Sequence, residues 1–219
     1  MKVELELYLP SEAEEITKVP QTTIRNWRRA GYLPSPKGHA RYNLPDLLLQ
    51  TSMQALVSRG ILPEVARTFA GEIARAIFQS MIYSHKTFSP KVYAAAQNEV
   101  GEIPQERVAR VKAALGEAYA PEVLELLECS TQMRKTASQA FGLAGMKTPS
   151  WVIIWANSEI EFYYSGDDER FDEKFFGDTS YGDPYTQGPI ILFSMGNMAQ
   201  MVLDRLPRPA IRLASEGNQ

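Results

Sequence analysis

Proline and glycine divide residues 8 to 60 into segments that are long enough only for short helices joined by tight turns. Ser11 is the expected N-cap of the first helix, with Glu14 completing a capping box three residues later. Pro20 opens a second helix, because proline is tolerated in a first turn. Gly31 ends that helix, since glycine readily adopts the left-handed conformation of a C-cap. The pattern therefore predicts a small helical domain built around two helices and a tight turn.

The charge of this region sets it apart from the rest of the chain. Residues 18–42 carry six basic side chains and no acidic one, in a chain whose net charge is -3. Residues 150–185 carry nine acidic and two basic side chains, a balance of -7. In the second helix Ile24 and Trp27 form a buried stripe, so the neighbouring arginines project outward. A basic helix of this kind fits the major groove and phosphates of double-stranded DNA.

The same segment resembles the DNA-binding domain of the MerR superfamily, a winged helix-turn-helix, over about residues 8–70. The residues that carry the resemblance are Val19, Thr23, Ile24, Arg25, Trp27, Gly31, Leu33 and Pro34, together with the wing pair Arg41 and Tyr42. Residues 54–69 resemble the third helix, glycine corner and fourth helix of the family. Two positions depart from the pattern: Lys18 replaces the usual turn glycine, and Glu14 replaces a small residue. The segment also resembles phage excisionases, which share this fold, and the sequence does not separate the two.

The MerR resemblance implies a cytoplasmic, homodimeric transcription regulator that binds an inverted-repeat operator and contacts RNA polymerase. The alternative is an architectural DNA-binding protein of excisionase type that acts in recombination. DNA contacts are expected from the second helix and the wing, at Lys18, Gln21, Thr22, Thr23, Arg25, Asn26, Arg28, Arg29, Lys37, His39, Arg41 and Tyr42. For Arg28 a solvated surface charge is the competing interpretation. Cys129 is the single cysteine, so the metal-sensing and redox-sensing branches are not expected.

Beyond the motif the sequence predicts a mainly α fold with a C-terminal α+β part, divided into residues 1–70, 71–145 and 146–219. Apolar residues at every fourth position, from Val65 to Met81, predict a long helix that another element must cover. Further helices are expected at 91–98, 105–119, 122–140 and 195–206. The C-terminal part is expected to hold a hairpin of residues 151–155 and 160–164, an acidic loop of some twenty residues, an apolar run at 190–193 and a short strand at 211–214.

The function of the C-terminal part is open at this level. Trp151, Trp155 and Tyr163 are candidates for a pocket that binds a small-molecule effector, with packing in the hairpin core as the alternative. The acidic loop could hold a hard cation for an enzyme, but it lacks the spacing of a calcium loop, and no nucleophile or phosphate-binding motif is present. We therefore expect no enzyme activity, no metal and no cofactor. No apolar run approaches the length of a membrane span.

Overall fold

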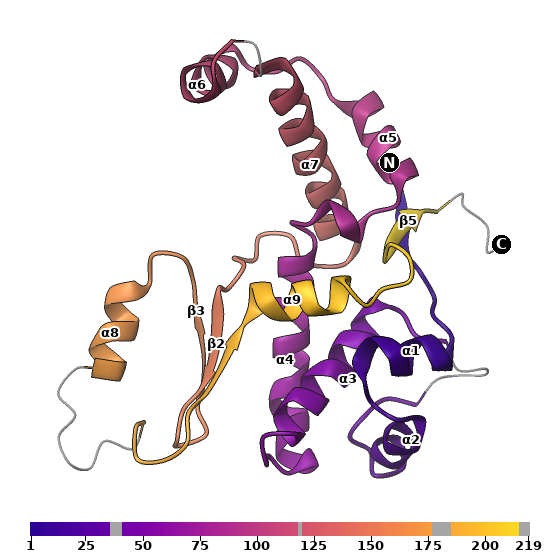
Figure 1. Ribbon diagram of the computed structural model, residues 1–219, viewed down its shortest axis with the longest axis vertical. Helices are drawn as coiled ribbons and strands as arrows, with labels where there is room; N and C mark the ends of the chain where they lie inside the picture. Colours follow the sequence, from indigo (N-terminus) through magenta and orange to yellow (C-terminus); the bar gives the residue numbers. More distant parts are fainter. Residues whose placement is uncertain (36–40, 118–119, 177–184, 215–219) are drawn as a thin grey trace. The chain divides into compact units, whose positions relative to one another are not determined.

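The computed structural model describes residues 1–35, 41–117, 120–176 and 185–214 (Figure 1). The chain forms two compact units. The first unit joins Met1–Leu7, Ile82–Gly145 and the segment from Pro207 onward. The second unit joins Tyr8–Met81 and Met146–Leu206. The division of the chain into residues 1–70, 71–145 and 146–219 stays a prediction.

The second unit begins with four helices. They are α1 (Pro10–Thr17), α2 (Gln21–Arg29), α3 (Leu44–Val57) and α4 (Pro63–Met81). α3 packs against α1 and, more extensively, along α4. The core between them holds apolar side chains without solvent exposure, among them Ile16, Ile24, Leu47, Leu48 and Leu56. The expected sequence of short helices and tight turns is confirmed.

The start of α1 differs from the prediction. Leu9 occupies the N-cap position, and its backbone N–H donates to a carboxylate oxygen of Glu12 at 2.7 Å. Ser11 lies inside the first turn and is not the cap, so that prediction was wrong. Pro10 explains the shift, because proline is favoured as the first helical residue, so the helix starts two residues earlier than predicted.

The end of α2 is as expected. Gly31 has a φ of 77°, in the left-handed region. The N–H of Tyr32 donates to the carbonyl of Trp27 at 2.8 Å, and the N–H of Gly31 donates to that of Arg28 at 3.0 Å. These are the two hydrogen bonds of a Schellman motif, which satisfies carbonyls at a helix end.

The apolar stripe of α4 is confirmed only in its second half. Ile73, Ile77 and Met81 are fully buried, but Val65 is 39% exposed. A helix turns 100° per residue, so a four-residue repeat drifts by about 160° between positions 65 and 81. The inner face at the start of α4 is carried instead by alanines, Ala66 and Ala70. α3 and α9 (Met195–Leu203) pack against α4 within this unit.

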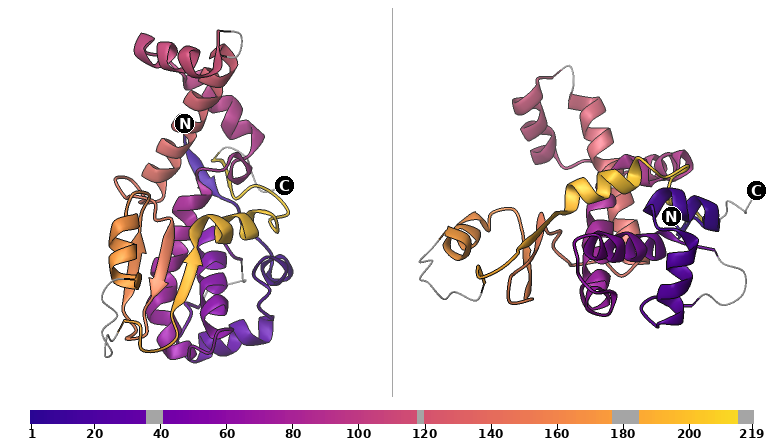
Figure 2. Two further views of the ribbon diagram at one scale, coloured as in Figure 1. Left: turned by 60° about the vertical axis from the view of Figure 1, so that its left-hand side comes forward. Right: turned by 60° about the horizontal axis from the view of Figure 1, so that its bottom comes forward.

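The second unit also contains a three-stranded antiparallel sheet, with strand order β3-β2-β4. Its strands are β2 (Trp151–Ile154), β3 (Ile160–Tyr163) and β4 (Ile191–Ser194). Val152 lies opposite Phe162 on one neighbour and Phe193 on the other, so these three side chains share a face. This face lies toward α4, and α8 (Asp168–Phe176) covers the opposite face (Figure 2). The predicted hairpin and apolar strand are confirmed.

The acidic segment after the hairpin was predicted to be a loop, and this was wrong for part of it. Residues 168–176 form α8, in which Phe171 and Phe175 stack with ring centroids 5.2 Å apart. Both rings pack against the buried cluster of Ile153, Trp155 and Tyr163. The two phenylalanines are four residues apart, which places them on one helix face. Burial of this face outweighs the acidity of the exposed face.

The first unit is built around a two-stranded antiparallel sheet of β1 (Val3–Leu5) and β5 (Ile211–Leu213). Its helices are α5 (Pro90–Glu99), α6 (Gln105–Leu115) and α7 (Ala120–Ala140), and α5 and α6 both pack against α7. Buried side chains between α5 and α7 include Val92, Ala96, Cys129 and Met133. Taken together, the chain is mainly helical with small antiparallel sheets, as expected.

Candidate nucleic-acid interface

The turn between α1 and α2 is formed at Lys18, in the left-handed conformation with φ 57° and ψ 26°. This conformation costs a non-glycine residue about 1–2 kcal/mol. Hydrogen bonds support the turn: the Thr17 hydroxyl donates to the Ala13 carbonyl at 2.7 Å and accepts from the Val19 N–H at 3.2 Å. The structure therefore reproduces the turn for which the family pattern has glycine, with a lysine side chain exposed at its apex.

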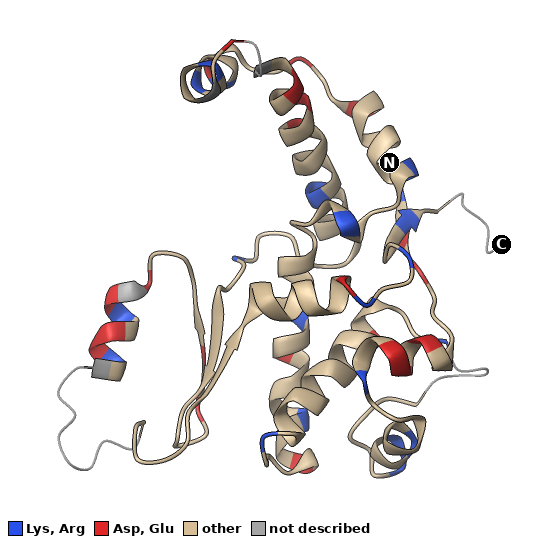
Figure 3. Ribbon diagram, in the orientation of Figure 1, with Lys and Arg blue, Asp and Glu red and all other residues tan. Residues whose placement is uncertain are grey.

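One face of α2 is exposed and basic. Its buried side consists of Ile24, with no solvent exposure, and Trp27, which is 6% exposed. The exposed side carries Thr22, Arg25, Asn26 and Arg29, spaced at i, i+3, i+4 and i+7. Figure 3 shows basic residues on α2 and acidic residues on the neighbouring α1. The outward face of α2 offers two guanidinium groups, an amide and a hydroxyl for hydrogen bonds to base edges and phosphates.

Three of the residues predicted to contact DNA are linked by hydrogen bonds within the domain, and their contacts with DNA stay a prediction. Arg28 is half-buried: its Nη1 donates to the Tyr42 hydroxyl at 3.0 Å, and its Nε donates to the Pro34 carbonyl at 3.2 Å. The guanidinium carbon also lies 5.0 Å from the centroid of the Tyr42 ring. The Tyr42 hydroxyl donates to Oε1 of Gln21 at 3.3 Å. These contacts fix α2 to the segment that follows it.

The Gln21 side chain extends this connection to α1. Its Nε2 donates to the Pro10 carbonyl at 2.7 Å, and its backbone N–H donates to the Glu14 carboxylate at 3.3 Å. Glu14, which occupies a position where the family has a small residue, therefore caps the first turn of α2. We call Gln21, Arg28 and Tyr42 the bracing cluster, because they hold α1, α2 and the start of α3 in one arrangement.

The wing is described only at its two ends. Tyr8 and Tyr42 form an antiparallel bridge, with N–H to carbonyl distances of 2.8 and 3.0 Å, and both side chains are buried. Arg41 is exposed beside this bridge. Lys37 and His39 lie outside the described residues. Thr23 is partly exposed at the edge of α2.

The second predicted site is not one cluster. Trp155 and Tyr163 are 1% and 2% exposed in the aromatic cluster of the sheet and α8, whereas Trp151 is 42% exposed outside it. Oε2 of Glu161 accepts from the Trp155 indole at 2.9 Å and the Tyr163 hydroxyl at 2.6 Å. Its Oε1 accepts from the Lys174 ammonium, which lies 3.7 Å from the Tyr185 ring centroid. The interior of this cluster is thus filled by the protein's own side chains, and a ligand-binding role for these residues stays a prediction.

The Glu161 carboxylate sits at the centre of these bonds. Burial raises its pKa, but the hydrogen bonds from Lys174, Tyr163 and Trp155 outweigh this effect and hold its pKa below the ordinary value of 4.5. The pKa of Tyr163 is raised, first by burial and then by its bond to the Glu161 carboxylate. Both groups therefore keep their ordinary neutral-pH charge states, as an internal ion pair with Lys174 requires.

Among the residues that the structure describes, no group of three or more His, Cys, Asp and Glu side chains is arranged to hold a metal ion. Nor does any helix there combine the length and the apolar character needed to cross a membrane.

The fold and surface of residues 8–71 are those of a helix-turn-helix DNA-binding domain. This segment matches the family model described as MerR HTH family regulatory protein, a family of DNA-binding transcription regulators. Residues 8–71 are therefore a MerR-type helix-turn-helix domain, while the rest of the chain is unassigned. No curated protein and no solved structure shows significant similarity to the chain.

Proposed function

We propose that this protein is a sequence-specific transcription regulator that inserts α2 into the major groove of its operator. The observation that carries the proposal is the exposed face of Thr22, Arg25, Asn26 and Arg29 on a helix held from behind by the bracing cluster. A rigid helix presents its side chains to base edges in one register, which sequence discrimination requires. Lys18, in the turn before α2, and Arg41, beside the bridge of Tyr8 and Tyr42, are both exposed and contact phosphates.

The protein is expected to act as a homodimer on an inverted repeat. One helix-turn-helix offers few contacts, and two copies on a two-fold axis read two half-sites together. In the first unit, the 21-residue helix α7 exposes Leu126 and Leu127 at 50% and 42%. Neighbouring exposed leucines on a long helix are typical of an interface with another protein surface. A second copy of the chain fits the proposed two-fold symmetry.

The DNA-binding proposal is tested by selecting bound sequences from a random pool of duplexes with the full-length protein at two salt concentrations. Enrichment of an inverted repeat that persists at the higher salt supports a sequence-specific dimer. Enrichment of several tandem sites with strong DNA bending supports the excisionase-type alternative. Binding without any enriched sequence would contradict the proposal, since phosphate contacts alone do not discriminate sequence.

The dimer is tested separately by light scattering coupled to gel filtration. The wild-type chain is expected to elute with twice the mass of 24.6 kDa. Replacing Leu126 and Leu127 together by glutamate should produce a monomer, because buried unpaired charges are costly at an interface. Gln139→Glu on the exposed surface of α7 is the matched control and should stay dimeric. A monomeric wild-type chain at micromolar concentration would contradict the dimer but not the proposal that α2 contacts the major groove.

Contact with RNA polymerase and control by a small-molecule effector are further expectations of such a regulator. An enriched operator placed upstream of a reporter promoter tests the first, with transcription by purified polymerase as the readout. Stimulation or repression by the protein on this template supports regulation, and transcription unchanged at full operator occupancy contradicts it.

A further inference from the structure

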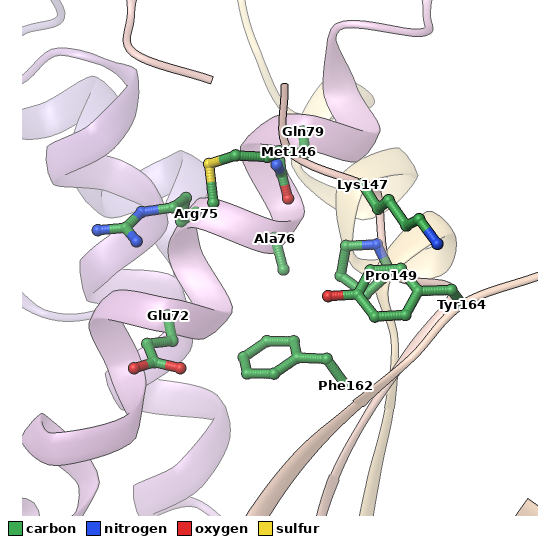
Figure 4. Close-up of a pocket in the computed structure, with 9 residues that line it drawn as sticks. All are labelled: Glu72, Arg75, Ala76, Gln79, Met146, Lys147, Pro149, Phe162 and Tyr164. Carbon is green, nitrogen blue, oxygen red and sulfur yellow. The ribbon is translucent and has the colours of Figure 1, made fainter. Parts of the chain in front are cut away.

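A cavity lies in the second unit between α4 and the segment around β3 (Figure 4). Its volume is about 230 Å³, and one side is formed by Glu72, Arg75, Ala76 and Gln79 of α4. The other side is formed by Met146, Lys147, Pro149, Phe162 and Tyr164. It is separate from the aromatic cluster of Trp155 and Tyr163, because Phe162 is on the opposite face of the sheet from Tyr163.

The walls of this cavity combine apolar and aromatic side chains with four polar or charged ones. In Figure 4 the rings of Phe162 and Tyr164 lie opposite Ala76, and the Tyr164 hydroxyl points toward the middle of the space. Pro149 is buried beside them. Aromatic side chains opposite a small alanine suit a flat ring, which gains both dispersion and edge contacts there. Such walls with a few polar groups are typical of a small-molecule site.

Gln79 supplies a polar group without a partner. The residue is only 4% exposed, and within the part of the chain that the structure describes its Nε2 has no hydrogen-bond acceptor. A buried donor left unpaired is costly, because it has lost its hydrogen bond to water. The last torsion of a glutamine side chain is broad and two-fold, so rotation by half a turn exchanges the positions of Nε2 and Oε1. Either atom can therefore face the cavity. A ligand oxygen that accepts from Nε2 removes the cost.

The charge at the rim favours an anionic ligand. Arg75 and Lys147 are exposed there against the single carboxylate of Glu72. The Lys147 ammonium lies 5.9 Å from the Tyr164 ring centroid, at the edge of the aromatic wall. A carboxylate attached to a ring would thus meet one positive charge in excess while its ring stays between the aromatic side chains.

We propose that this cavity binds a small aromatic carboxylate, with the ring against Phe162 and Tyr164 and the carboxylate accepting from Gln79. Lys147 strengthens binding through its charge. The ligand sits against α4, which packs along α3 of the helix-turn-helix domain. It therefore contacts a helix that packs against that domain, and through this helix the ligand controls DNA binding. This control of DNA binding depends on the proposed function, but the binding of the ligand to the cavity does not.

The test is isothermal titration of the full-length protein without DNA. Benzoate and phenylacetate are the anionic probes, benzamide and benzyl alcohol are neutral, and benzylamine is cationic. The anionic probes should bind best. Gln79→Glu keeps the shape of the side chain but replaces the donor by a carboxylate, so it should weaken benzoate binding at least about tenfold, the loss expected for one hydrogen bond and a like charge. Lys147→Gln should weaken benzoate but not benzyl alcohol.

Controls make the result specific to the cavity. Arg67→Gln changes an exposed cation on α4 that does not line the cavity, and it should leave benzoate binding unchanged. Thermal unfolding by circular dichroism shows whether each variant is folded. If Gln79→Glu does not fold, Lys147→Gln, which changes an exposed side chain, provides the test of the cavity. No heat with either anionic probe overturns the proposal. Equal binding by the wild type and the folded cavity variants, or tighter binding of benzylamine, also overturns it.

Discussion

Lys18 carries two roles that can be separated by substitution, because it is both strained in its backbone and exposed as a cation. Replacing it by glycine removes the left-handed cost, and we expect the free energy of unfolding to rise by about 0.5–1 kcal/mol. The same change removes the charge that we propose contacts a phosphate, so DNA affinity should fall. Urea unfolding and titration of an operator duplex measure the two effects.

Lys18→Ala is the matched control for this prediction. It removes the same charge but keeps a β-carbon in the left-handed conformation. Its DNA affinity should fall as far as that of Lys18→Gly, while its stability should show no gain. Equal stability of the two variants would mean that the turn is not strained.

Glu161 leads to a prediction about acid sensitivity. Its pKa is lower in the folded protein than in the unfolded chain, so its ionised form stabilises the fold above a pH of about 4.3. This stabilisation is lost as the pH falls through the lower folded pKa. Glu161→Gln should reduce the free energy of unfolding at pH 7 by roughly 1–3 kcal/mol, with a smaller difference from wild type below pH 4. Urea midpoints between pH 3 and 7 measure this.

Glu159→Gln provides the comparison, because Glu159 is exposed near the turn between β2 and β3 and is not part of the hydrogen-bonded group of Glu161 and Lys174. Its effect on stability should be small throughout this pH range. If the difference between Glu161→Gln and wild type did not narrow in acid, the carboxylate would not be the stabilising group.

The elements of the helix-turn-helix show how far the sequence could predict the site. Spacing along α2 identified the buried stripe and its exposed neighbours, since both follow from a period of 3.6 residues. It could not separate Arg28 from Arg25, because the partner of Arg28 is Tyr42, fourteen residues later and beyond the wing. The roles of these arginines depend on tertiary contacts that local periodicity does not contain.

Arg25 and Arg28 should therefore respond differently to truncation. Arg25→Ala is expected to reduce the slope of log affinity against log salt by about one, as loss of one phosphate contact does, with stability unchanged. Arg28→Ala should lower the free energy of unfolding by about 1–2 kcal/mol, because the Tyr42 hydroxyl and Pro34 carbonyl lose their donor. Salt-dependent binding and urea unfolding of both variants provide the comparison. A full salt-slope change without loss of stability in Arg28→Ala would contradict the bracing role.

The helix α8 is an element that the sequence pattern did not predict. Six of its nine residues are charged, the other three are phenylalanines, and the segment lies in the most acidic part of the chain. Its helical state depends on a surface provided by Trp155 and Tyr163 for Phe171 and Phe175. Short helices are marginal alone, so such packing decides whether they form.

At the scale of the whole molecule, the sequence predicted β5 but not its partner. β1 and β5 are separated by more than 200 residues, and no local pattern indicates that Val3 pairs with Leu213. Ion pairs reinforce the sheet, with Arg212 contacting Glu4 at 2.9 Å and Glu6 at 3.0 Å. The first unit is thus assembled from three separate parts of the chain.

Arg212→Ala should loosen the first unit alone. The Arg212 side chain is 13% exposed, and its removal leaves Glu4 without this cation and Glu6 with its bond to Arg208, at a cost of about 1–3 kcal/mol. Hydrogen exchange should become faster in α5 and α7, while α2 and α3 keep their protection. Arg110→Ala, which removes an exposed pair with Glu106, is the control and should change little. Uniformly faster exchange across both units would show that they do not open independently.

The pairing of β1 with β5 also sets an order of events during synthesis on the ribosome. Residues 8–81, which contain the helices α1 to α4, leave the exit tunnel long before residue 211 is made. β1 emerges before its partner β5, and more than 200 residues are made between them. The nascent chain can therefore acquire its helix-turn-helix early, while the unit that holds α7 is completed only after residue 211 has been made.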